Sequence, residues 1–98
     1  MDAQQILEAI NNDLQGADEV TGGFMNPQIE ITFQVDKRVD VENHIMYWHI
    51  YPNYVVRKHY TGNNLNVESW NIEGVSRFLA PHVVFHHSPD MNTLWQGE

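Results

Sequence analysis

Residues 44–61, HIMYWHIYPNYVVRKHYT, hold two stretches rich in aromatic and β-branched residues on either side of Pro52 and Asn53. Such residues favour strands, whereas Pro and Asn favour turns, so this segment is predicted to form a β-hairpin. A four-residue loop at 51–54 places Trp48 opposite Arg57. The hairpin therefore fixes which side chains share each face of the sheet.

One face of this hairpin is expected to carry all four tyrosines of the chain, because successive side chains of a strand point to opposite faces. We call it the tyrosine face, and its candidate partner-binding residues are Tyr47, Tyr51, Tyr54, Tyr60, His49 and Lys58. Tyrosine suits protein interfaces because it supplies rigid, amphipathic contact area. The opposite face is drier and is predicted to be the core side, with Met46, Trp48, Ile50 and Val55. The alternative is that a helix covers the tyrosine face, which would make the tyrosines core residues.

The N-terminal third predicts a helix, a loop and a strand. Apolar residues recur at helical spacing, Asp2 stands at an N-cap position and Gly16 at a C-terminal one, so a helix is expected from Ala3 to Gln15. Residues 16–27 hold three of the six glycines and are predicted to be a loop. Residues 29–35 alternate apolar and polar side chains, which indicates a half-buried strand, with a turn at 36–38.

The C-terminal part predicts a second helix and a last strand. After a turn at 62–64, residues 65–69 are expected either to add a short strand or to lead directly into a helix. That helix is expected to run to about Ala80 with Val75, Phe78 and Leu79 facing inward. Residues 82–87 predict the last strand, and the apolar tail around Trp95 is expected to dock on its own domain or on a neighbour.

These segments together predict a single α+β domain over residues 1–98. It comprises an N-terminal helix, an antiparallel sheet of about four strands, and a second helix packed on one face. With 42% hydrophobic residues, a chain of this length can bury a core without disulfides or metals.

The chain is acidic, with 13 Asp and Glu against 5 Lys and Arg and a formal net charge of −8. Cationic patches supply most of the affinity for phosphate backbones, so direct binding to nucleic acid is disfavoured. Asp13, Asp18 and Glu19 lie in the acidic N-terminal segment and are expected to steer a basic protein partner. The alternative is that this charge only maintains solubility.

The absence of cysteine argues against a disulfide-dependent secreted scaffold. No basic stretch precedes an apolar one near the N-terminus, and no apolar run approaches the roughly 18 residues of a membrane span. We therefore expect a cytoplasmic protein without membrane contact, located in the host cytoplasm if the chain is viral.

No residue pattern predicts catalysis or metal binding. The segment beginning at Gly74 resembles the start of a G-x-S-x-G nucleophile elbow around Ser76 but lacks the second glycine. On a strand, His82 and His86 would stand about 13 Å apart, too far to share an ion. His44 and His59 lie diagonally across the hairpin and would need help from another ligand. We expect no enzymatic activity, no cofactor and no metal.

The chain carries no motif of a known family. Its order of helix, strands, helix and strand is loosely similar to that of secretion chaperones, phage-encoded inhibitors and toxin-immunity proteins, a likeness of fold alone. The leading hypothesis is a non-enzymatic acidic protein-binding protein, a phage-encoded inhibitor of anti-defence or immunity type that blocks a basic nucleic-acid-handling protein. The alternatives are a structural or chaperone-like homodimer and a small hydrolase or metal-dependent enzyme.

Overall fold

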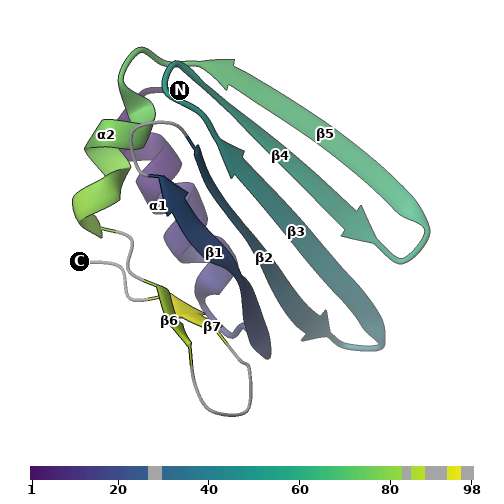
Figure 1. Ribbon diagram of the computed structural model, residues 1–98. Helices are drawn as coiled ribbons and strands as arrows, with labels where there is room; N and C mark the ends of the chain where they lie inside the picture. The colour runs from purple at the N-terminus through teal and green to yellow at the C-terminus, as the bar shows by residue number, and fades with distance from the viewer. Residues whose placement is uncertain (27–29, 83–84, 88–92, 96–98) are drawn as a thin grey trace.

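The computed structural model describes residues 1–26, 30–82, 85–87 and 93–95, with the backbone alone at 23–26, 85–87 and 93–95 (Figure 1). The elements follow in the order α1 (Ala3–Leu14), β1 (Glu19–Asn26), β2 (Glu30–Val39), β3 (Glu42–Ile50), β4 (Tyr54–Thr61), β5 (Asn64–Asn71), α2 (Val75–Leu79), a 3₁₀ turn (Ala80–His82), β6 (Phe85–His87) and β7 (Thr93–Trp95). Strands β1 to β5 form one antiparallel sheet in chain order, and β6 pairs with β7. The α+β class is confirmed, with five strands in the main sheet rather than about four.

Helix α1 begins as its sequence predicts. The Asp2 side chain accepts the backbone N–H of Gln5 at 2.9 Å, and the Gln5 side chain accepts the backbone N–H of Asp2 at 2.9 Å. This reciprocal capping box satisfies two N–H groups that the first turn would otherwise leave unpaired. The helix ends at Leu14, and Gly16 adopts φ +75°, the left-handed conformation that glycine tolerates best.

The hairpin of β3 and β4 has the predicted register. Trp48 lies opposite Arg57, and the backbone N–H of Tyr51 donates to the Tyr54 carbonyl at 2.8 Å across the connection. Trp48 is fully buried, so the face that it shares is the core side as expected.

The core lies between one face of the main sheet and the two helices (Figure 1). Its buried apolar side chains are Ile6, Leu7, Ile10, Ile31, Phe33, Val35, Met46, Trp48, Ile50, Val55, Val75 and Leu79. Phe78 was expected among them but is 38% exposed. The helix α2 spans only five residues, so only one narrow side of it faces the core, and that side carries Val75 and Leu79.

The prediction of a loop over residues 16–27 is wrong, because residues 19–26 form the edge strand β1. A Cβ atom at Gly22 would lie 2.5 Å from the Phe33 Cα, so glycine lets β1 approach β2 closely. The register then shifts between Gly23 and Asn26. Here the glycines mark an irregular strand rather than a loop.

The turn predicted at 36–38 is also wrong. Strand β2 continues to Val39, and the chain reverses at Asp40, whose φ of +57° places it in the left-handed region. Asp is one of the few residues other than glycine that tolerate this conformation.

The two possibilities for residues 65–69 are resolved in favour of a strand. Strand β5 spans Asn64–Asn71 and pairs with β4 without interruption. Because this strand extends to Asn71, α2 begins only after Gly74, which adopts φ +72°.

The last predicted strand is shorter than expected. His82 belongs to the 3₁₀ turn, residues 83–84 lie outside the described part, and β6 covers only Phe85–His87. The backbone of β7 contacts β1, so the described part of the C-terminal tail docks on its own domain.

Candidate functional site

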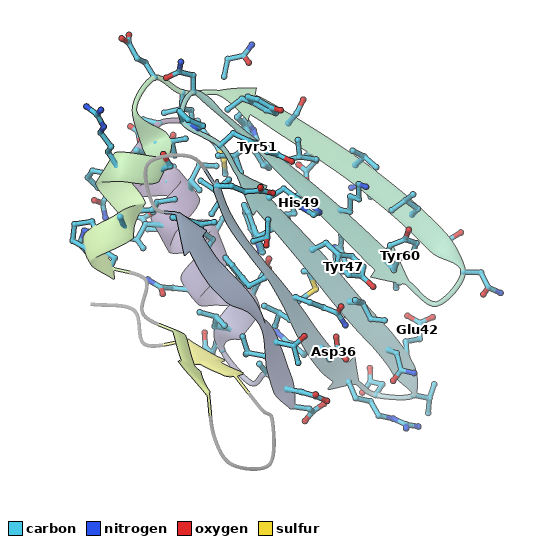
Figure 2. All side chains as sticks on the ribbon, in the orientation of Figure 1. Asp36, Glu42, Tyr47, His49, Tyr51 and Tyr60 are labelled. Carbon is cyan, nitrogen blue, oxygen red and sulfur yellow. The ribbon has the colours of Figure 1, made fainter. Side chains whose placement is uncertain are left out.

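The tyrosine face is the side of the main sheet turned away from the helices. Figure 2 shows Tyr47, His49, Tyr51 and Tyr60 standing on the near face, with α1 behind the sheet. Tyr47 lies opposite Lys58, and Ile45 lies opposite Tyr60. In the part of the chain that the structure describes, no helix covers this face.

The four tyrosines form two ring pairs. Tyr51 and Tyr54 stack with centroids 4.4 Å apart and an interplanar angle of 18°. Tyr47 and Tyr60 meet edge to face at 5.8 Å and 83°. Such pairs restrict the rotamers of the rings, which would lower the entropy cost of any binding at this face. Tyr54 is 42% exposed, and the other three are half-buried.

Two shallow hollows lie on this face and meet at His49. One, of about 240 Å³, is lined by Tyr51, Tyr54, Val56, Lys58 and His49. The other, of about 210 Å³, includes Thr32, Gln34 and Tyr47. Each is the size of a side chain rather than of a large cofactor, which suits the side chains of a protein partner.

At the centre of the tyrosine face, His49 and Tyr51 lie among the charges of Lys58 and Glu30. Burial, and then the Lys58 ammonium, lower the pKa of His49, while Glu30 opposes the shift. Burial, Glu30 and Tyr54 raise the pKa of Tyr51. His49 is therefore neutral and Tyr51 protonated at pH 7, so both can form hydrogen bonds without carrying charge.

Two of the three expected steering residues lie at one end of this face. Asp18 and Glu19 are exposed, and they line a hollow of about 330 Å³ whose other lining residues include the acid Asp36 and the bases Lys37 and Arg38. Asp18 Oδ2 accepts the backbone N–H of Arg38 at 2.8 Å. Glu19 lies directly opposite Asp36 on the tyrosine face, an arrangement of like charges that costs folding stability. We call Asp18, Glu19 and Asp36 the acidic corner, which lies beside Ile45, the residue opposite Tyr60. Lys37 and Arg38 line the same hollow, so the three acids exceed the bases there by one charge.

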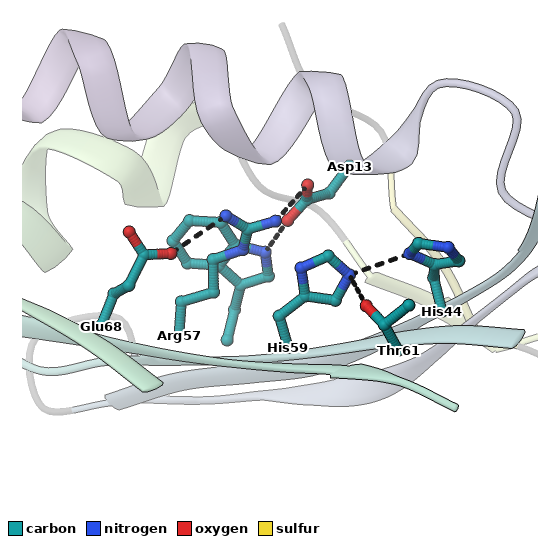
Figure 3. A network of polar contacts seen from close by, with 7 residues as sticks. Asp13, His44, Arg57, His59, Thr61 and Glu68 are labelled. Atoms are coloured by element: carbon teal, nitrogen blue, oxygen red, sulfur yellow. Dashed lines mark hydrogen bonds and ion pairs between the residues drawn. The ribbon is translucent and has the colours of Figure 1, made fainter. Parts of the chain in front are cut away.

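Asp13, the third expected steering residue, does not belong to this surface. It lies in the last turn of α1 and points toward the core side of the sheet, where it is 8% exposed. Its Oδ2 accepts Trp48 Nε1–H at 2.8 Å, and its Oδ1 accepts Arg57 Nη2–H at 3.0 Å (Figure 3). A carboxylate already enclosed by two donors cannot steer a partner, so the prediction for Asp13 is corrected.

Arg57 joins this buried network to the edge of the sheet. Its guanidinium lies over the Trp48 ring, with Cζ 5.5 Å from the centroid, and Nη1 donates to Glu68 Oε1 at 3.3 Å. This cation–π contact lies beneath α1, because Asp13 of that helix accepts from both Trp48 and Arg57.

The structure enlarges the tyrosine face beyond the predicted residues. Glu30, Thr32 and Gln34 on β2 extend it on one side, and Leu65 and Val67 on β5 extend it on the other. The alternation of polar residues in β2 already indicated a wet face. The sequence did not show how β2 pairs with β3, and this pairing is what places its polar side chains beside the tyrosines.

Among the described residues, the histidines form no metal site and Ser76 forms no catalytic site. His44 Nδ1 and His59 Nε2 lie 3.0 Å apart, a distance that fits a direct hydrogen bond. No group of three or more metal-binding side chains occurs in the described ranges, and the side chains of His86 and His87 lie outside them. Ser76 is fully buried and so is not positioned as an accessible nucleophile.

Comparisons with protein-family models, with curated proteins and with solved structures gave no match. Within the described residues, no helix has the length and apolar character needed to span a membrane.

Proposed function

We propose that this chain is a non-enzymatic protein-binding protein that holds its partner on the tyrosine face. The observation that carries the proposal is the absence of any described helix over an array of four paired tyrosines. Aromatic side chains with a polar tip are enriched at the centres of protein interfaces.

The partner is proposed to be basic. The acidic corner at Glu19 and Asp36 places two like charges opposite each other at a cost in folding stability, and a cationic side chain of a partner would relieve that repulsion. The net charge of −8 would also attract a basic surface from a distance. A nucleic-acid-handling protein has such a surface, so the role proposed is that of an inhibitor that occupies it.

Paired affinity capture tests this proposal. Two baits are used in the same lysate, the wild-type protein and the Tyr47→Ala/Tyr54→Ala variant. The variant removes one ring from each pair. We expect at least one basic protein to be retained by the wild type and lost with the variant. A Val41→Ala bait, altered at a site 83% exposed in the β2–β3 turn, serves as the matched control. Equal capture by all three baits would contradict the proposal.

A further inference from the structure

The outer edge of β5 is a second surface with unsatisfied bonding capacity. Strand β5 ends the main sheet, and no described strand lies on its outer side (Figure 1). An exposed edge presents a row of backbone N–H and C=O groups to any strand that can pair with it.

The hydrogen bonds of the sheet show which residues of β5 present these groups. The Tyr51–Tyr54 bond makes that pair a hydrogen-bonded one, so alternate residues of β4 from Tyr54 onward direct their backbone groups toward β3. The residues between them, including Val55 and Arg57, therefore bond to β5. The bond from Gly62 N–H to the Asn43 carbonyl shows the same alternation.

It follows that the even-numbered residues of β5 bond inward to β4. The odd-numbered ones, Leu65, Val67 and Ser69, direct their N–H and C=O groups outward. Leu65 and Val67 also expose 50% and 53% of their surfaces. The edge thus carries two exposed apolar side chains among polar ones, and its outward backbone groups are open.

The two edges of the main sheet differ. Strand β1 is interrupted by a register shift after Gly23, and β6 and β7 contact it. Strand β5 contains no Pro, Lys or Arg, keeps its register over all eight residues, and has its one charge, Glu68, bound to Arg57. Proteins usually block an edge with charges, prolines or bulges, and the described part of β5 has none of these on its outward side.

We propose that β5 pairs antiparallel with β5 of a second copy of this chain, with Val67 on the two-fold axis. In this register Leu65 faces Ser69 of the partner copy and Asn66 faces Glu68, so no like charges meet. Moving the axis to Glu68 would place two carboxylates opposite each other. The one charge of β5, Glu68, is paired with Arg57 of the neighbouring strand, so the edge offers little that would select a basic partner, unlike the acidic corner. Pairing would join two tyrosine faces into one continuous surface.

Sedimentation of the full chain over a concentration series tests this pairing. We expect the wild type to self-associate reversibly and Val67→Lys, which brings two ammonium groups to the axis, to weaken association at least tenfold. Val41→Lys adds the same charge at the β2–β3 turn and should associate like the wild type. A wild type that stays monomeric up to roughly 1 mM, at the weak end of specific binding, would overturn the proposal. Equal association of both variants, or equal loss in both, would do so as well.

A proline substitution separates loss of pairing from loss of folding. Val67→Pro removes an N–H that points outward, so it should keep its circular dichroism and thermal midpoint while becoming monomeric. If it unfolds, the outward direction assigned to Val67 is wrong.

The register has its own test. Leu65→Lys alone should weaken association, and adding Ser69→Glu should restore it, because each introduced lysine then faces an introduced glutamate of the other copy. Within one strand the two positions stand about 13 Å apart and cannot pair with each other. Failure of the second change to restore association would contradict the register. These experiments measure association of the purified chain with itself, whereas the capture experiment measures another protein bound to the tyrosines, so the two proposals can fail independently.

Discussion

Asp13 links helix α1 to the centre of the sheet through two buried donors, Trp48 Nε1–H and Arg57 Nη2–H. Burial raises the pKa of the Asp13 carboxyl, and the opposing effects of Arg57 and of the Trp48 hydrogen bond do not fully offset this. The ionised carboxylate is therefore costly to bury, yet it is the acceptor that satisfies both donors.

Replacing Asp13 by Ala should lower the free energy of unfolding by about 2 to 5 kcal/mol, because two buried donors lose their acceptor. Chemical denaturation measures this loss. Asp18→Ala removes an exposed acid five residues further along the chain and should cost about 1 kcal/mol or less. Similar losses in the two variants would show that the Asp13 network contributes no special stability.

The stability of the fold should decrease as pH falls below about 6.5. Burial, Arg57 and His44 lower the pKa of His59, and burial and Lys58 lower that of His49. A group with a lowered folded-state pKa stabilises the fold above its unfolded pKa and loses that contribution as pH falls through the folded value. The raised pKa of Asp13 acts with the opposite sign, since protonation removes the cost of its buried charge.

Urea denaturation between pH 7.5 and pH 5.5 checks this sign. The double variant His49→Gln/His59→Gln should show a flatter dependence of unfolding free energy on pH than the wild type. Because Asp13 contributes equally to both proteins, a double variant that loses as much stability on acidification as the wild type would contradict the assignment of both histidines.

At the scale of elements, the close approach of β1 to β2 depends on Gly22. This residue has φ +147°, and an added Cβ would meet the Phe33 backbone at 2.5 Å. Gly62 in the β4–β5 turn also has a positive φ, of +60°, but an added Cβ there would meet nothing within 4 Å.

Gly62→Ala should therefore cost only about 1 to 2 kcal/mol of conformational strain. Gly22→Ala adds a clash with backbone, and should cost about 3 kcal/mol or more, because overpacking alone costs about 1 to 3. Thermal or chemical unfolding of both variants measures the difference. Equal losses would indicate that β1 does not approach β2 as closely as described.

The sequence predicts the elements whose signals are local. The capping residues of α1 and the aromatic alternation of β3 and β4 each depend on a few neighbouring residues, and both are confirmed. The faces of the hairpin follow from its register, so Trp48 could be assigned to the core without any knowledge of the helices.

The sequence does not predict features that depend on distant contacts. The glycines of β1 resemble a loop until Phe33 is known to lie against them. Asp13 resembles a surface acid at the end of a helix, because its two donors come from Trp48 and Arg57, far along the chain. The acidic corner was equally hidden, since it forms only when β1 pairs with β2.

At the scale of the whole molecule, the two faces of the sheet differ in composition, and we propose that one serves stability and the other recognition. The covered face holds the apolar core and the buried Asp13 network, and the tyrosine face holds paired rings, shallow hollows and the acidic corner. Substitutions on the covered face should therefore lower mainly the free energy of unfolding, and substitutions on the tyrosine face should weaken mainly partner binding.

The acidic corner should act mainly on the rate of association. Neutralising it with Asp18→Asn and Glu19→Gln removes charge, and the introduced amide oxygen at position 18 can still accept the Arg38 N–H. We expect slower association with the captured partner at low salt, and a smaller difference from the wild type as salt is raised. Folding stability should stay equal or rise slightly, because the repulsion opposite Asp36 is relieved. Association rates identical to the wild type at low ionic strength would remove the electrostatic part of the proposed function.

Calorimetric titration of the captured partner with wild-type protein and with Tyr47→Ala/Tyr54→Ala, alongside denaturation of both proteins, tests most directly whether the tyrosine face is the binding surface. Two broken ring pairs should cost about 1 to 3 kcal/mol of stability, less than the roughly 3 to 5 kcal/mol expected for Trp48→Ala in the core. The dissociation constant should rise about 30-fold or more, the effect of losing one or more hot spots. An unchanged dissociation constant, or a loss of stability equal to that of Trp48→Ala, would contradict the assignment of the tyrosines to a recognition surface.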